Sequence, residues 1–431
     1  MTADAPAPDS VSGLNTPMES AFEIEARKPP RFPRLKRQLQ NLPPFFSDAK
    51  LLFRPRNYYF YRDNLDNSKN QAWAMGGSVA FESGWFMDRV KLGGEFFTSQ
   101  KLYGPLDRDG TGLLETGQRH YNVLGQAYGI LKIAEHHKVS LFRQEYDLPY
   151  VNKNDSRMTP NTFEGYSVQG RFDRKGKRPQ IEYIAGYIAK MKPRNSDAFI
   201  SMAEAAGAGD DVDRGTIVSG FRVAPTDKIA FGAVNFLTPD ALNILYVEGS
   251  YERDVTKNLS LRLKGQFTDQ RSVGSDLLTG SSFDTHVGGA ELAASYRSGV
   301  LRAAFSVTSD EADITSPFGT YPGYLALMQS DLNSAGETAW LLGLSYDFKR
   351  IGLDGLSAFA NFASRTNLID PSTGASLPDE GEIDVTVDYK LPDGRFKGFW
   401  VRLRGAYLDE SGIDDWSREY RIILNYEIPL L

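Results

Sequence analysis

Arginine side chains with a spacing suited to binding anions lie near both ends of the chain. Arg54, Arg56 and Arg62 are an even number of positions apart, so in an extended strand their side chains point to the same face. Arg402 and Arg404 share one face of an alternating segment near the C-terminus. A guanidinium group is planar and permanently charged, and it offers paired hydrogen bonds to a carboxylate. The two rows can act together only if the fold brings both ends of the chain side by side.

The composition excludes several classes of protein. Of the 431 residues, 41% are hydrophobic and 24% are charged, values too ordinary for a disordered chain. No run of about 18 apolar residues is present, so the sequence does not encode a membrane protein built from helices. The net charge of -6 gives no indication of nucleic-acid binding. Because the chain has no cysteine and its four histidines form no ligand motif, we expect no metal site and no cofactor.

A two-residue period begins near residue 47 and continues to residue 431. In the clearest segment, from Glu382 to Lys390, apolar side chains at odd positions alternate with polar side chains at even positions. About 18 segments of this kind follow one another, and antiparallel closure into a barrel requires an even number. Short connections, such as 225–227 and 297–299, alternate with long ones, such as 194–213 and 311–335.

This alternation predicts an all-β fold, a transmembrane antiparallel β-barrel of about 18 strands over residues 47–431. Short periplasmic turns and long extracellular loops are typical of outer-membrane barrels. The alternative is a large soluble protein of two β-sandwich domains, but no break in the pattern marks a second domain.

A Pro-rich extension is expected over residues 1–46. It is acidic at first and becomes basic at Arg31, Arg34, Lys36 and Arg37, and we expect it to lie in the periplasm or to be flexible. The residues after Met1 lack the basic start and apolar core of a secretory signal peptide, so we expect an exported protein to be represented here in processed form.

The distribution of charge along the strands indicates which face points inward. In the segment from Leu259 to Thr268, Arg262 and Lys264 share one face, and leucines occupy the other. A lysine or arginine at the lipid midplane would cost about 2 to 4 kcal/mol, so the charged face must line the lumen. A lumen of this kind holds water, and a barrel of about 18 strands is wide enough for an aqueous channel.

Three blocks of sequence resemble one known family. They are Leu51-Leu52-Phe53-Arg54-Pro55-Arg56-Asn57-Tyr58-Tyr59-Phe60-Tyr61-Arg62-Asp63, the stretch from Tyr324 to Trp340, and the ending from Glu419 to Leu431. In this order they resemble the first strand, the long seventh loop and the last strand of the OprD family of substrate-specific outer-membrane porins. The resemblance runs from about Phe46 to Leu431, and the N-terminal extension has no counterpart in it.

The resemblance implies an 18-stranded channel in the outer membrane of a Gram-negative bacterium, monomeric or weakly trimeric, with loops folded into a narrow lumen. Its expected partners are outer-membrane lipid and small carboxylate-bearing solutes, such as amino acids and aromatic or other organic acids, and not nucleic acid. It also implies a ladder of arginines along the wall, formed by Arg54, Arg56, Arg62, Arg402, Arg404 and Arg421. Closure of a barrel pairs the first strand with the last, which would bring these arginines together.

The resemblance further implies two loops at the constriction. The loop from Tyr146 to Pro160 resembles the family's third loop, and its candidate residues are Asn154, Asp155, Ser156 and Arg157. The Ser156 hydroxyl would face the arginines, and Asp155 would repel polyanions or hold a cationic substituent. The seventh loop supplies Tyr324 and Asp331.

Two other functions remain open from the sequence. An unselective general porin would have the same strand pattern with a wider constriction. A barrel enzyme would need a Ser-His pair facing lipid, but the outward positions are almost all aliphatic or aromatic. We therefore expect no enzymatic activity and no catalytic residues.

Overall fold

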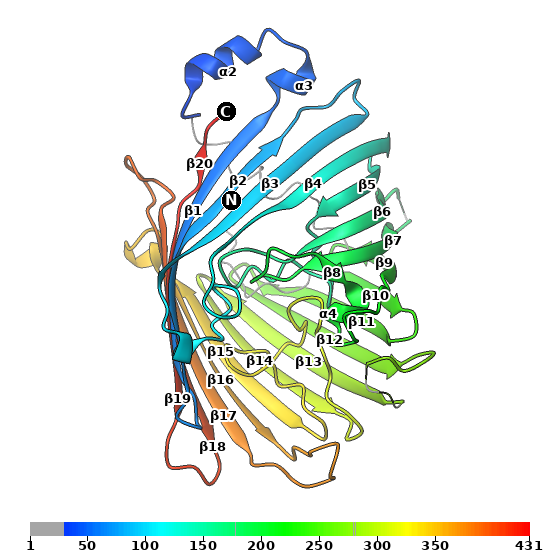
Figure 1. The fold of residues 1–431 in the computed structure, drawn as a ribbon, viewed down its shortest axis with the longest axis vertical. Coiled ribbons are helices and arrows are strands. Elements are labelled where there is room, and N and C mark those ends of the chain that lie inside the picture. Colours follow the sequence, from blue (N-terminus) through cyan, green and yellow to red (C-terminus); the bar gives the residue numbers. More distant parts are fainter. Residues whose placement is uncertain (1–29, 177, 279, 281) are drawn as a thin grey trace.

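The computed structural model describes residues 30–431 except 177, 279 and 281, and these residues form a closed antiparallel β-barrel (Figure 1). Twenty strands form one sheet, and two of them, β8 (Ile200–Ser201) and β20 (Ile428–Pro429), have only two residues each. The others are β1 (Lys50–Asp63), β2 (Lys69–Glu82), β3 (Val90–Tyr103), β4 (Tyr121–Ala134), β5 (His137–Gln144), β6 (Thr162–Phe172), β7 (Gln180–Lys192), β9 (Thr216–Thr226), β10 (Ile229–Thr238), β11 (Leu242–Thr256), β12 (Leu259–Ser272), β13 (Asp284–Tyr296), β14 (Gly299–Thr308), β15 (Thr338–Asp347), β16 (Leu356–Thr366), β17 (Glu380–Lys390), β18 (Trp400–Glu410) and β19 (Ser417–Asn425). The predicted barrel of 18 strands is confirmed, because the long strands number 18.

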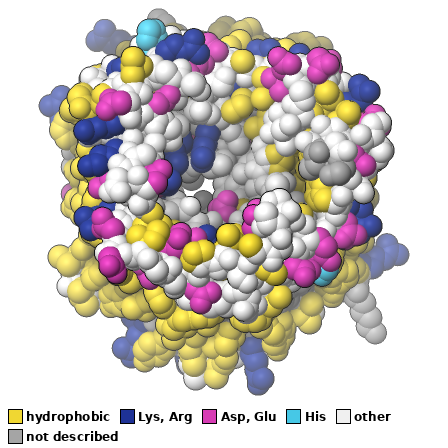
Figure 2. All heavy atoms as spheres, turned by 60° about the horizontal axis from the view of Figure 1, so that its bottom comes forward, with side chains coloured by type: hydrophobic (Ala, Val, Ile, Leu, Met, Phe, Trp, Pro, Cys, Tyr) yellow, Lys and Arg dark blue, Asp and Glu magenta, His cyan; other side chains and the backbone are white. Residues whose placement is uncertain are grey.

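The two-residue period decides which side chains face the lumen. Along β17, Glu382, Asp384 and Thr386 are buried in the interior, whereas Ile383 and Val385 are exposed on the outer wall. Figure 2 shows hydrophobic side chains covering the outer surface below the mouth of the barrel. An apolar outer surface with charged side chains inside is the arrangement that a hydrocarbon environment requires.

Closure of the barrel joins the two ends of the chain. β1 pairs with β2 on one side and with β19 on the other, and the short β20 continues the second pairing opposite Leu52 and Phe53. β7 pairs directly with β9, while β8 adds only a short hairpin to the end of β7. Closure leaves no unpaired sheet edge in the described chain between β1 and β19.

The connections sort into a short and a long end of the barrel, as the sequence predicts. The turns at 135–136, 227–228, 257–258 and 297–298 lie at one end, and the loops 104–120, 145–161, 193–215 and 309–337 lie at the other. The alternation is not strict, because three connections at the long-loop end are short themselves, at 64–68, 239–241 and 411–416. The third and seventh connections at this end are named L3 (residues 145–161) and L7 (residues 309–337).

L3 and L7 fold inward and pack together inside the barrel. Tyr150 of L3 lies edge-on against Tyr321 of L7 at a ring distance of 6.1 Å, and both are buried. Asn152 donates from Nδ2 to the Thr320 carbonyl at 3.1 Å and accepts from the Thr320 amide at 2.8 Å. The two loops therefore form one rigid unit that partly fills the lumen (Figure 1).

Part of the predicted extension forms two short helices at the end of the barrel where the C-terminus lies (Figure 1). These are α2 (Pro33–Leu39) and α3 (Pro44–Ser47), and the Arg31 amide donates to the Pro429 carbonyl at 2.8 Å. The acidic first part of the extension lies outside the described residues. The other helices are α4 (Met202–Ala205) and the 3-10 turns η1 (Leu106–Arg108) and η2 (Phe348–Ile351). No helix in the described chain has the length and apolar character needed to cross a membrane.

Candidate functional site

Six arginines from both ends of the chain lie on one stretch of the inner wall, which we call the arginine wall. Its members are Arg54, Arg56 and Arg62 on β1, Arg402 and Arg404 on β18, and Arg421 on β19. In the register of the sheet, Arg421 is opposite Arg404 on one side and Phe60 on the other. Figure 2 shows Lys and Arg side chains lining one side of the opening.

Two members of the wall are neutralised by carboxylates of other strands, Glu95 of β3 and Asp388 of β17. Arg54 Nη1 lies 2.7 Å from Glu95 Oε1. Arg402 donates from Nε and Nη2 to both oxygens of Asp388, at 2.8 and 3.0 Å. These bidentate or short contacts hold the guanidinium charge in place and leave little of it for a passing anion.

Arg56 is neutralised by L3. Its Nη1 and Nη2 donate to the two carboxylate oxygens of Asp155 at 2.5 and 2.9 Å, and Nη1 also donates to the Arg157 carbonyl at 2.6 Å. Asp155 therefore anchors L3 to the wall. From the sequence, we expected Asp155 to repel polyanions or hold a cationic substituent, but in the structure its carboxylate is bound to Arg56.

Arg404 and Arg421 differ from these flanking arginines. Arg404 donates from Nε to the Thr386 hydroxyl at 3.0 Å, and no carboxylate of the described chain lies within salt-bridge distance of it. Arg421 is hydrogen-bonded to Glu419, but the same carboxylate also accepts from Arg62 Nε at 2.6 Å. Glu419 thus compensates two arginines with one charge.

L3 and the loop after β7 add two more guanidinium groups at this level. Arg157 donates from Nε to the Thr111 carbonyl at 2.7 Å and from Nη1 to the Ser156 carbonyl at 3.0 Å. Arg194 donates to Asn154 Oδ1 at 3.0 Å and to the Ser156 hydroxyl. Both arginines are held by neutral acceptors, and within the described ranges neither has a carboxylate at salt-bridge distance.

Arg157, Arg194, Arg404 and Arg421 form what we call the central cluster. The guanidinium carbons of Arg157 and Arg421 lie 5.2 and 5.3 Å from the ring centre of Phe60, a distance at which a cation is attracted to an aromatic face. Burial lowers the pKa of Arg157, and the positive charges of Arg421 and Arg194 lower it further. Since arginine stays protonated in proteins, this crowding of like charge makes the cluster a strong attractor for an anion.

A carboxylate holds L7 against the same wall. Glu382 of β17 accepts backbone hydrogen bonds from Met328, Gln329 and Ser330 at 3.0, 2.9 and 2.9 Å. The Met328 carbonyl in turn accepts from Arg421 Nη2 at 3.2 Å. L7 therefore reaches the central cluster through its backbone, fixed by one buried side chain.

The two remaining candidates come from L7. The Tyr324 hydroxyl donates to Glu248 Oε2 of β11 at 3.0 Å, on another part of the wall. Asp331 lies near Arg194 of the cluster, whose positive charge partly offsets the rise in the pKa of Asp331 that desolvation causes. The structure thus brings Asn154, Asp155, Ser156 and Arg157 to the arginine wall but places Tyr324 away from it.

A cavity of about 710 Å³ lies along the wall on the short-turn side of L3. It is lined by Arg54, Arg56, Glu95, Glu145 and Asp155 among others. Gln126 donates to both Glu95, at 2.7 Å, and Glu145, at 3.0 Å. Burial raises the pKa of Glu145 to about 7, and the Glu95 carboxylate adds to this rise.

Two residues of the site were not identified from the sequence. Arg194 lies in a loop that was noted only for its length, and Glu382 was noted only as part of an alternating face. Glu382 could have been singled out as a carboxylate on an inward face, but its partners in L7 lie more than 50 positions away.

No group of three or more His, Cys, Asp or Glu side chains that could hold a metal ion occurs in the part of the chain that the structure covers.

A closed barrel with an apolar exterior, a charged lumen and inward loops defines a channel-forming outer-membrane protein. The model of the OprD family, outer membrane porins, matches residues 43–430. The chain therefore belongs to the OprD family, and it is a porin of the Gram-negative outer membrane. No curated protein matches it in sequence.

Solved porin structures share this fold. Pseudomonas aeruginosa OccK9 (OpdG) is 23% identical and has a TM-score of 0.78, with 90% of this chain and 100% of that chain covered. Pseudomonas aeruginosa OpdK with vanillate is 20% identical with a TM-score of 0.77, covering 89% and 100%. A BenF-like porin from Pseudomonas fluorescens Pf-5 is 18% identical with a TM-score of 0.76, covering 90% and 100%.

Proposed function

We propose that this porin carries small carboxylate-bearing solutes by facilitated diffusion and that the central cluster binds the carboxylate on its way. The observation that carries the proposal is the charge imbalance of the cluster. Arg157, Arg194 and Arg404 have no carboxylate within salt-bridge distance in the described chain, and Arg421 shares its only one with Arg62. A solute carboxylate would supply the missing charge and accept two or more charge-assisted hydrogen bonds.

The flanking arginines have a different role in this proposal. Arg54, Arg56 and Arg402 are already paired, so they shape the wall and position L3. Because their charge is compensated, they add little net positive potential and no open hydrogen-bonding site. On the arginine wall the solute is therefore held only at the centre.

The structural neighbours support a carboxylate as the solute. One of them was solved with vanillate, which is the anion of an aromatic carboxylic acid. The Phe60 ring beneath the central cluster gives an aromatic acid an apolar contact next to the guanidinium groups. We further propose that the protein acts as a monomer or a weak trimer, since the binding site is formed within one barrel.

The alternatives are a general porin and a barrel enzyme. A general porin would lack a built anion site, whereas L3 and L7 here are fixed to the wall by Asp155 and Glu382. The relatives are porins, and we propose that this chain has no catalytic activity either.

The experiment is liposome swelling with a carboxylic acid and its amide, benzoate and benzamide. Replacing Arg404 by Gln should slow entry of benzoate much more than that of benzamide, because the change removes charge but little volume. Arg404→Lys should restore part of the benzoate flux, since lysine keeps the charge and loses the planar fork. Equal slowing of acid and amide would show that Arg404 only fills space, and the proposal would be withdrawn.

A further inference from the structure

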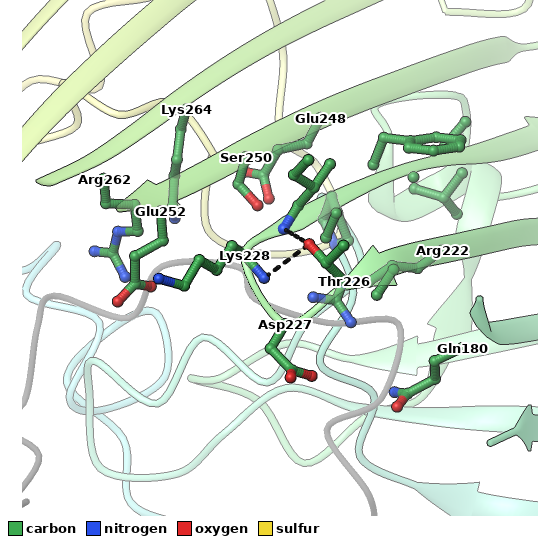
Figure 3. Close-up of a pocket in the computed structure, with 18 of the residues that line it drawn as sticks. Gln180, Arg222, Thr226, Asp227, Lys228, Glu248, Ser250, Glu252, Arg262 and Lys264 are labelled. Carbon is green, nitrogen blue, oxygen red and sulfur yellow. Dashed lines mark hydrogen bonds between the residues drawn. The ribbon is translucent and has the colours of Figure 1, made fainter. Parts of the chain in front are cut away.

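A second cavity lies on another part of the wall, away from the central cluster. It has a volume of about 360 Å³ and is lined mainly by β9, β10, β11 and β12 (Figure 3). Strands β13 to β18 lie between β12 and the β19 strand that carries Arg421. The cavity runs from the β9–β10 turn, at Asp227 and Lys228, to Lys264 in the lumen. It therefore opens toward the short-turn end of the barrel.

Two cations on β12 face this cavity without a carboxylate partner, and we call them the β12 pair. Arg262 and Lys264 are two residues apart on the inward face, which separates them by about 6.5 Å along the strand. Neither has a carboxylate within salt-bridge distance or a hydrogen-bond partner among the side chains that the structure describes. Arg262 Nε is buried and unpartnered.

Of the two cations, Lys264 gives the stronger indication of a binding site. Its side chain is only 4% exposed, yet it lines the cavity (Figure 3). Its Nζ lies 5.6 Å from the ring centre of Tyr324 in L7. A buried ammonium group normally has a carboxylate or several hydrogen-bond acceptors, so a bound anion would supply the partner that Lys264 lacks.

Three carboxylates surround the β12 pair, and none of them forms an ion pair with it. Glu248 accepts from the hydroxyls of Tyr246 and Tyr324, each at 3.0 Å. Glu291, opposite Lys264 in the register, is held by Arg302 at 3.2 Å. Glu252, opposite Arg262, is exposed and lies beyond salt-bridge distance of it.

The other cations of the cavity each have a carboxylate partner, and Arg174 lies 2.7 Å from Asp227. Arg222 is 3.4 Å from Glu182, and Lys228 is 2.9 Å from Asp254. Arg262 and Lys264 are thus the cations of this cavity that have neither a carboxylate nor a side-chain acceptor in the described chain. Because Glu248 and Glu252 also line the cavity, the pair offers an anion unoccupied hydrogen-bond donors and not a surplus of positive charge.

We propose that the β12 pair is a second anion-binding site, which takes the carboxylate of a solute on the short-turn side of the constriction. The ammonium of Lys264 and the guanidinium of Arg262 bind its two oxygens, while the Tyr324 ring flanks the solute. This assignment rests on the proposed function, because it supposes that carboxylates pass the central cluster. The two sites then hold the solute on either side of L7, and Glu252 weakens the second one so that the solute can leave.

The test is block of single-channel current by benzoate added to one chamber at a time. Each channel's orientation is established in a Lys257→Cys background, because the chain has no other cysteine and a bulky, membrane-impermeant thiol reagent reaches the β11–β12 turn from one side only. Lys264→Gln should raise the half-blocking benzoate concentration about fivefold when benzoate is added on the short-turn side. From the long-loop side the change should stay under about twofold.

Lys228→Gln is the matched control, since it removes a lysine that lines the same cavity but is paired with Asp254. We expect it to leave block unchanged, and we expect Glu252→Gln to strengthen block from the short-turn side. Arg262→Gln serves as a second variant should Lys264→Gln fail to assemble a heat-modifiable barrel.

Equal effects of Lys264→Gln and Lys228→Gln, or no effect of either β12 variant, would overturn the second site. Failure of the proposed function is recognised separately, because Arg404→Gln would then leave benzoate block unchanged from both sides. An effect of Lys264→Gln together with an inert Arg404→Gln would keep the second site and remove the first.

Discussion

The flanks and the centre of the arginine wall use the same residue type in opposite ways. At the flanks, Arg402 and Asp388 form a bidentate pair, and Arg56 is clamped by Asp155. At the centre, Arg404 has only a threonine hydroxyl, and Arg194 has an amide and a hydroxyl. The difference shows that the number of arginines in a lumen does not measure its capacity to bind anions. What matters is how many of them the protein has left without a carboxylate.

The largest effect is expected from removing charge at the centre of the wall, whereas the matched change at a flank should have little effect. Arg404→Gln should lower the benzoate-to-benzamide flux ratio about tenfold, which corresponds to about 1.4 kcal/mol. The double variant Arg402→Gln with Asp388→Asn removes a whole ion pair and should change the ratio by less than about twofold. Liposome swelling measures both. Similar losses in the two variants would erase the distinction between flank and centre.

A smaller effect is expected from removing the carboxylate partner of a flank arginine, which is then unpaired like the arginines of the central cluster. Asp155→Asn leaves Arg56 without its carboxylate, so it should increase the affinity for benzoate about threefold in single-channel block. Met158→Leu is the matched control, because it alters the same loop without changing its charge or a hydrogen bond of the central cluster. A decrease in affinity for Asp155→Asn would mean that the anchoring of L3 matters more than the charge it neutralises.

The next effect concerns the loop that borders the centre. Glu382→Gln replaces an acceptor of three backbone amides by a group with a single carbonyl oxygen, so L7 should lose part of its anchor. We expect conductance to rise about twofold, with more current noise, as the constriction loosens. Leu341→Val, on β15 in the apolar cluster that includes Tyr324 and Leu325 of L7, is a control for packing. Unchanged conductance and noise would show that L7 is held by its apolar contacts alone.

The smallest expected effect is a dependence of ion selectivity on pH, caused by Glu145 near the flank arginines. Burial and the Glu95 carboxylate raise the pKa of Glu145 to about 7, so Glu145 is charged at pH 8 and largely neutral at pH 6. Lowering the pH should therefore increase the permeability of chloride relative to potassium by about 1.5-fold, as measured from reversal potentials. In Glu145→Gln this change should vanish, and its persistence would assign the titration to another group.

Much of the fold could be predicted from the sequence, because the two-residue period is a direct consequence of strand geometry in lipid. Arg262 and Lys264 could be placed in the lumen from the cost of exposing them to hydrocarbon, and the structure has them there. The pairing of β1 with β19, which places Phe60 opposite Arg421, followed from closure alone. The helices at Pro33–Leu39 and Pro44–Ser47 were not predicted, since a Pro-rich basic segment gives no clear helical period.

The ion-pairing pattern could not be predicted. Whether Arg402 is neutralised depends on the register of β17 against β18, which sets Asp388 opposite it. Whether Arg56 is neutralised depends on the path of L3, and loop paths are set by tertiary contacts such as the hydrogen bonds between Asn152 and Thr320. The sequence therefore indicated which arginines line the wall, but not which of them are available to a solute.

The most direct test of the central claim is a crystal structure of the protein soaked in 4-bromobenzoate, with anomalous scattering to locate the bromine. We predict a carboxylate hydrogen-bonded to Arg404 and Arg421, within reach of Arg194, and a ring beside Phe60. Density that appears only at the paired flank arginines Arg54 or Arg402, with the centre empty at a concentration that blocks the channel, would contradict it.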